Sequence, residues 1–142
     1  MMTKEEVVKE QLINRLTSLL PQVEVEDLDS EGRFQGTDFD LVARVRIGKV
    51  KKIFLIEVRS SGQPRYLRQV IAEFEGRDFS GANVYPVIAA PYVSPRGMAI
   101  CRRHEVGCVD LMGNVYLGID SVYVERVVEE RPDRRKREIK HL

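Results

Sequence analysis

The chain has 142 residues, of which 43% are hydrophobic and 32% charged, and its formal net charge is +1. This length fits one domain with a single core, and the hydrophobic share excludes an intrinsically disordered chain. Charged residues interrupt every apolar run well short of the ~18 residues that a membrane-spanning helix needs. The N-terminal segment is charged from residue 4 onward and shows no secretory signal pattern, which predicts a cytoplasmic protein.

Basic residues gather at the C-terminal end of the sequence. Residues 131–142 contain six basic residues against two acidic ones, namely Arg131, Arg134, Arg135, Lys136, Arg137 and Lys140 against Asp133 and Glu138. Such a segment can bind the phosphate backbone of DNA without sequence preference, or can be a plain solvated terminus. We therefore expect a domain over residues 1–128 and a basic C-terminal tail over residues 129–142.

Several common chemistries find no support in the sequence. Cys101 and Cys108 match no zinc or redox spacing, so we expect two reduced, partly buried thiols. The segment SSGQP at residues 60–64 lacks the lysine and the spacing of a phosphate-binding loop. Three tyrosines adjoin or lie within β-prone segments, which favours packing over base stacking: Tyr85, Tyr92 and Tyr116.

The first predicted element is an amphipathic helix. Thr3 and Glu6 form a T-x-x-E capping box at its start, and Pro21 marks its end. Between them, apolar residues recur at three- and four-residue spacing: Val8, Leu12, Leu16 and Leu19. Beyond the helix, Val23 and Val25 alternate with polar residues, which predicts a half-exposed strand.

Two β-prone segments follow and should pair as a hairpin. Phe39–Ile47 alternates polar and apolar residues, and Lys52–Arg59 has a continuous apolar centre. The connection between them is short and contains Gly48, which is typical of an antiparallel hairpin.

The second half of the sequence predicts two further helices and several strands. One helix begins near Pro64 and ends at Gly76, and another runs from Ser94 to about His104. Strands are expected at Val84–Ala90, Gly107–Leu111 and Val115–Leu117, with a last extended piece through Val122, Val124 and Val127. The order of helix, three strands, helix, strand, helix and strands indicates a mixed α/β fold with a central sheet flanked by helices.

Acidic residues within the predicted hairpin are the main chemical anomaly. Glu57 lies in the apolar strand, where a carboxylate is unfavourable unless something compensates it. Arg59, two residues later, points to the same face of the strand. Asp40 on the neighbouring strand can reach the same patch. Two carboxylates that converge at a sheet edge are suitable ligands for Mg²⁺, although a surface ion pair and turn chemistry would also account for these residues.

This pattern resembles the PD-(D/E)XK nuclease superfamily. The segments GTDFDLVAR and IFLIEVRSSG supply an Asp, sixteen intervening residues and then E-x-R, followed by a helix that carries Gln69. The element order over roughly residues 3–90 is similar to the αβββαβ core of that superfamily. The resemblance implies a single-domain, restriction endonuclease-like fold and a nuclease that acts on DNA.

The resemblance also implies roles for individual residues. Asp40 and Glu57 would hold Mg²⁺, or Mn²⁺ as a substitute, with the backbone carbonyl of Val58 as a third ligand. Arg59 stands where the family has lysine, and Gln69 matches a glutamine found near the site in several branches. Family members often add a glutamate from the first helix, for which Glu5 and Glu10 are both candidates.

Arg59 leaves two functional hypotheses open. Arginine keeps its proton, so Arg59 can stabilise charge on a phosphate but cannot act as a general base. The first hypothesis is an Mg²⁺-dependent DNA nuclease, for which a homodimer would allow both strands to be cut. The second is a catalytically degenerate domain that binds DNA, or a protein partner in a defence or repair assembly, without cutting.

Overall fold

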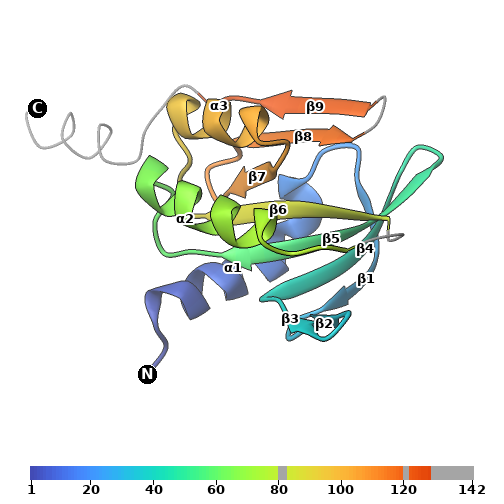
Figure 1. Ribbon diagram of the computed structural model, residues 1–142. Helices are drawn as coiled ribbons and strands as arrows, with labels where there is room; N and C mark the ends of the chain where they lie inside the picture. The colour runs from blue at the N-terminus through green and yellow to red at the C-terminus, as the bar shows by residue number, and fades with distance from the viewer. Residues whose placement is uncertain (80–82, 120–121, 129–142) are drawn as a thin grey trace, which may run out of the picture.

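A seven-stranded mixed β-sheet forms the centre of the molecule (Figure 1). The computed structural model describes residues 1–79, 83–119 and 122–128. The helices and the strands of the sheet are α1 (Lys4–Leu19), β1 (Glu24–Asp29), β4 (Leu41–Ile47), β5 (Val50–Val58), α2 (Pro64–Glu75), β6 (Val84–Ala90), α3 (Pro95–Arg103), β7 (Gly107–Asp110), β8 (Val115–Ile119) and β9 (Val122–Arg126). The predicted mixed α/β class and the αβββαβ order of the core are confirmed.

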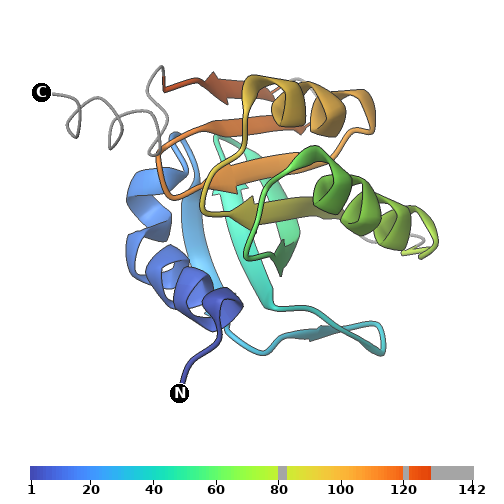
Figure 2. The same cartoon turned by 90° about the vertical axis from the view of Figure 1, so that its left-hand side faces the viewer.

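The sheet has the strand order β1-β4-β5-β6-β7-β8-β9. The pairs β5–β6 and β6–β7 are parallel, and the remaining pairs are antiparallel. Figure 2 shows α1 on one side of the sheet and α2 and α3 on the other. Each side has its own core: α1 packs with one set of inward-facing strand residues, and α2 and α3 pack with the other.

The capping box at the start of α1 is confirmed. The Thr3 hydroxyl accepts the Glu6 N–H at 3.1 Å, and the Glu6 carboxylate accepts the Thr3 N–H at the same distance. The residues of the predicted apolar stripe are all buried: Val8, Leu12, Leu16 and Leu19. The capping box therefore fixes the residue at which α1 begins.

The predicted hairpin is also confirmed, as β4 and β5. Its register pairs Leu41 with Ile56 at one end and Ile47 with Val50 at the other. Gly48 in the connecting turn has a φ of 61°, a left-handed conformation that glycine adopts without strain. Since Leu41 is paired with Ile56, Asp40 emerges beside the end of β5.

A small second hairpin was not predicted. The strands β2 (Arg33–Phe34) and β3 (Thr37–Asp38) form a separate two-stranded sheet around a turn at Gln35 and Gly36, both of which have positive φ. Strands of two residues leave no alternation to read, so the sequence around them indicates only a turn. This ribbon precedes Phe39, whose buried ring stacks on the ring of Phe74 in α2.

The last residue of β7 is a buried carboxylate with a structural explanation. Asp110 is 0% exposed, and its two oxygens accept the backbone N–H groups of Val93, Met112 and Asn114 and the side-chain amide of Asn114. The Asn114 oxygen in turn accepts the Val128 N–H at 2.6 Å. This network joins the loop before α3 to the end of the described chain, so its acid serves to hold the fold together.

Several smaller expectations can be compared with the structure. Cys101 and Cys108 are free thiols, and both are fully buried instead of partly buried. Tyr85 and Tyr116 are buried, as packing residues should be, whereas Tyr92 is half-buried. The predicted basic tail at 129–142 lies outside the described residues. None of the described helices is long and apolar enough to cross a membrane.

Candidate functional site

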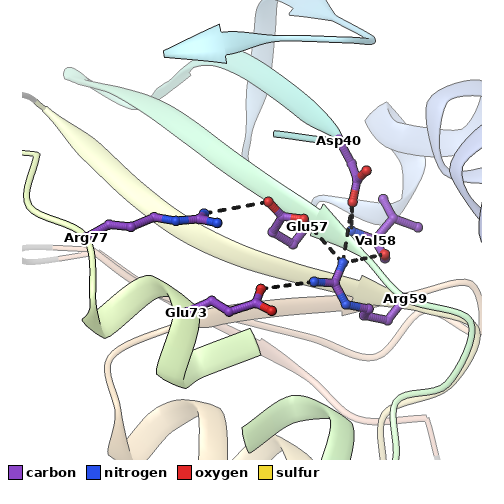
Figure 3. Close-up of polar contacts among 6 residues, drawn as sticks. All are labelled: Asp40, Glu57, Val58, Arg59, Glu73 and Arg77. Atoms are coloured by element: carbon purple, nitrogen blue, oxygen red, sulfur yellow. Dashed lines mark hydrogen bonds and ion pairs between the residues drawn. The ribbon is translucent and has the colours of Figure 1, made fainter. Parts of the chain in front are cut away.

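Three of the predicted site residues meet where β5 ends (Figure 3). Asp40 lies just before β4, and its Oδ2 accepts the backbone N–H of Val58 at 2.7 Å. Glu57 is the penultimate residue of β5, and Arg59 follows the strand directly. The β4–β5 register and the alternation of β5 therefore bring Asp40, Glu57 and Arg59 to one patch, on the side of the sheet that faces α2.

The oxygen atoms of this patch surround a single nitrogen, Nη1 of Arg59. This nitrogen donates to the Val58 carbonyl at 2.9 Å and lies 3.2 Å from Glu57 Oε2 and 3.6 Å from Asp40 Oδ2. The three oxygens are those that the sequence resemblance names as metal ligands. In this structure the positive group at their centre is therefore the guanidinium of Arg59.

Two further charged residues complete the cluster and were missed by sequence reasoning. Glu73 on α2 accepts from Nη2 of Arg59 at 3.1 Å. Arg77, just beyond α2, places its Nη1 3.8 Å from Glu57 Oε1, and its guanidinium lies 5.1 Å above the Phe39 ring. Glu57 thus has one guanidinium near each of its oxygens.

Signals for the two missed residues differ. Glu73 lies one helical turn after Gln69, so the same face of α2 that suggested Gln69 also contained Glu73. Arg77 follows the helix end at Gly76, and nothing in the local pattern indicates that it turns back toward the sheet.

Gln69 itself does not join the cluster. It is exposed on α2, and within the described part of the chain no hydrogen bond connects it to Asp40, Glu57 or Arg59. Its suggested role is therefore still a prediction. On this face of α2 it is Glu73 that contacts Arg59.

Glu57 is a buried acid in a cluster that contains more acidic than basic side chains. Its exposed fraction is 8%. Burial is the main factor that raises the pKa of Glu57 to about 7, and the neighbouring Asp40 carboxylate adds to the rise while Arg59 opposes it. Asp40, Glu57 and Glu73 bring three carboxylates against the two guanidinium groups of Arg59 and Arg77, which leaves one negative charge in excess when all are ionised.

A cavity of about 470 Å³ opens beside Asp40 and Val58. Its other wall is the first part of α1, from which Lys4, Glu5 and Lys9 line it. Glu10 lines a neighbouring hollow that does not include Asp40. Of the two first-helix acids, Glu5 is therefore the one that shares a cavity with the candidate site.

The residues present fit a divalent metal ion. Two carboxylate oxygens and a backbone carbonyl are hard donors of the kind that Mg²⁺ prefers, with water filling the remaining positions. The excess negative charge of the fully ionised cluster indicates that additional positive charge would be stabilised here. In the described residues no group of three acidic, histidine or cysteine side chains forms a metal site by itself, so the Val58 carbonyl is needed as the third donor.

Comparisons with known proteins give a likeness of structure only. No family model matches the chain, and no curated protein matches it. Two solved structures do match, at 15% identity over 78% of this chain: EndoMS in its apo form, with a TM-score of 0.49, and an EndoMS–dsDNA complex, with a TM-score of 0.48. The chain spans about half the length of these proteins, 47% and 46% respectively. The function proposed below therefore rests on the geometry of the site.

Proposed function

We propose that this chain is an Mg²⁺-dependent nuclease that hydrolyses phosphodiester bonds in DNA. In this proposal Asp40, Glu57 and the carbonyl of Val58 hold the metal ion, and Mn²⁺ can replace Mg²⁺. A bound divalent ion would supply Lewis-acid stabilisation of charge on the phosphodiester and lower the pKa of a water molecule. The observation that carries the proposal is the convergence of the three oxygens on one positively charged atom.

The arrangement of the protein's own groups supports this chemistry. The hydrogen bond from the Val58 N–H fixes the Asp40 carboxylate at the strand end, so the acid is oriented before any ligand arrives. The cavity beside Asp40 and Val58 leaves an approach to the site from the α1 side. Lys4 and Lys9 lie on that wall beside the acidic residues Glu5 and Glu6.

Arg59 takes a role that differs from that of a lysine. Its guanidinium remains charged at every accessible pH, so it does not abstract a proton from water. Its fixed donors can instead bind the phosphate oxygens on which negative charge develops during hydrolysis. Proton removal from the attacking water is then left to solvent.

A second candidate function is favoured by the contacts of Arg59. Its Nη1 already satisfies the Val58 carbonyl and lies beside both carboxylates, as it would in a domain that has lost its metal ion. Such a domain would bind DNA, or a protein partner, without cutting. The two functions differ in whether the carboxylates bind a divalent ion.

Cleavage assays distinguish the two functions. The purified chain is incubated with supercoiled, linear, branched and single-stranded DNA in the presence of Mg²⁺, Mn²⁺ or EDTA. A nuclease cuts at least one substrate with metal and none with EDTA, and Asp40→Asn and Glu57→Gln both abolish cutting. Asp38→Asn is the matched control, because Asp38 is exposed, close in sequence and forms an ion pair with Arg33 at 3.8 Å. DNA binding without cleavage under all conditions would contradict the nuclease and support the second function.

A further inference from the structure

Glu73 gives the Arg59 guanidinium a second partner outside the set of candidate metal ligands. Nη2 of Arg59 lies 3.1 Å from Glu73 Oε2, while Nη1 lies among the oxygens of Asp40, Glu57 and Val58 (Figure 3). The Glu73 side chain is 50% exposed, so it is free to move with its partner, whereas the Glu57 side chain is 10% exposed.

Nη1 and a divalent ion cannot occupy the centre of the three oxygens together. Mg²⁺ binds its oxygen ligands at about 2.0–2.1 Å, which is closer than Nη1 now approaches any of them. An ion bound to all three oxygens would take the place that Nη1 now occupies, and the two positive charges would also repel each other strongly. Metal binding therefore requires the guanidinium to leave the oxygens, and a guanidinium that leaves needs another acceptor.

We propose that Glu73 is a positioning residue that holds the Arg59 guanidinium aside when a divalent cation occupies the oxygens of Asp40, Glu57 and Val58. This inference rests on the metal site of the proposed function. Glu73 is suited to the role because it is already bonded to Arg59 and comes from α2, not from the strands that carry the ligands. Arg59 is then a tethered competitor of the metal ion, and Glu73 reduces that competition.

Calorimetric titration with Mn²⁺ alone tests this role without any measurement of cleavage. The proteins are wild type, Glu73→Gln, Arg59→Met and the double variant. Glu75→Gln is the matched control, because Glu75 lies on the same helix but pairs with His104. Circular dichroism confirms that each variant is folded, and Glu73→Asp tests whether a shorter carboxylate restores binding.

The expected result is a dependence on Arg59. Glu73→Gln should weaken Mn²⁺ binding by roughly fivefold or more in wild type, and Glu75→Gln by no more than about twofold, since an exposed charge farther from the ion is screened. Arg59→Met should bind Mn²⁺ more tightly than wild type. In the Arg59→Met background, Glu73→Gln should have an effect no larger than about twofold, because only its charge is then lost. Glu73→Asp should recover part of the affinity.

Three results would overturn the inference, and they separate it from the proposed function. If Glu73→Gln weakened Mn²⁺ binding equally with and without Arg59, only the charge of Glu73 would matter. Mn²⁺ binding to Arg59→Met but not to wild type would show that the guanidinium is not held aside, although the three oxygens do form a metal site. Absence of binding to both proteins would contradict the metal site itself, and with it the proposed nuclease.

Discussion

Asp40 and Val58 are joined by a hydrogen bond of 2.7 Å from the Val58 N–H to Asp40 Oδ2, across the end of the β4–β5 hairpin. This bond orients the Asp40 carboxylate beside the carbonyl of Val58. Val58 therefore contributes both the N–H that holds Asp40 and a candidate metal ligand. Because the bond involves the main chain, the position of Asp40 does not depend on another flexible side chain.

Replacing Glu57 by glutamine should stabilise the protein at alkaline pH. Because the folded-state pKa of Glu57 is raised from 4.5 to about 7, the folded state binds more protons than the unfolded state between these values. Stability therefore falls as pH rises through this window, and a residue that cannot ionise avoids the loss. The gain should reach about 2–3 kcal/mol at pH 8 and be near zero at pH 4.5. Urea unfolding at the two pH values measures it.

The comparison with Glu75→Gln makes this prediction specific. The Glu75 side chain is 58% exposed, so its substitution removes no buried carboxylate and is the matched control. If Glu57→Gln were no more stable than wild type at pH 8, ionisation of the buried Glu57 carboxylate would not destabilise the folded state.

Substitutions of Arg59 should separate charge from proton transfer. Arg59→Ala should lower the rate of DNA cleavage by about 10²–10³-fold, since a preorganised donor to a developing negative charge contributes about that much. Arg59→Lys should keep the activity or raise it, because lysine retains the positive charge and can also orient water. Single-turnover cleavage under saturating metal measures both. Equal loss in the two variants would instead indicate that the forked geometry of arginine is essential.

Removing Asp110 should destabilise the fold without affecting the candidate site. Asp110→Ala leaves buried N–H groups of Val93 and Asn114 without their acceptor, which should lower the free energy of unfolding by about 3–5 kcal/mol. Asp110→Asn retains one acceptor oxygen and should lose less. Chemical denaturation measures both, and Asp38→Asn serves as an exposed control. A loss below 1 kcal/mol for Asp110→Ala would show that the network is not structural.

Residues 129–142 are predicted to add non-specific affinity for DNA. Each phosphate that the tail neutralises contributes a slope of about −0.9 to the dependence of log affinity on log salt for duplex DNA. A chain that ends at residue 128 should therefore show a flatter salt dependence in fluorescence anisotropy. An unchanged slope would show that the tail makes no contact with DNA phosphates.

The fold was largely predictable because its elements are signalled locally. The capping box at Thr3 and Glu6, the Gly48 turn and the proline near the start of α2 each mark an element boundary by their own chemistry. Alternation within β5 was sufficient to place Glu57 and Arg59 on one side of the sheet. The β2–β3 ribbon escaped prediction because two residues per strand carry no periodic signal.

The candidate site was predictable only in part, since its remaining members depend on packing between distant elements. Asp40, Glu57 and Arg59 follow from the hairpin register, which is a local property. Glu73 reaches Arg59 only because α2 packs on that face of the sheet, and Arg77 reaches Glu57 with its guanidinium lying over the Phe39 ring. The position of Nη1 between the three oxygens is a tertiary property that no sequence spacing encodes.

A crystal soaked with Mn²⁺ and measured for anomalous scattering tests the central claim most directly. The account predicts a peak that is coordinated by Asp40 Oδ2, Glu57 Oε2 and the Val58 carbonyl, with Nη1 of Arg59 withdrawn from these oxygens and the guanidinium still bonded to Glu73. Nη1 still among the three oxygens, with no anomalous peak between them at saturating Mn²⁺, would contradict it.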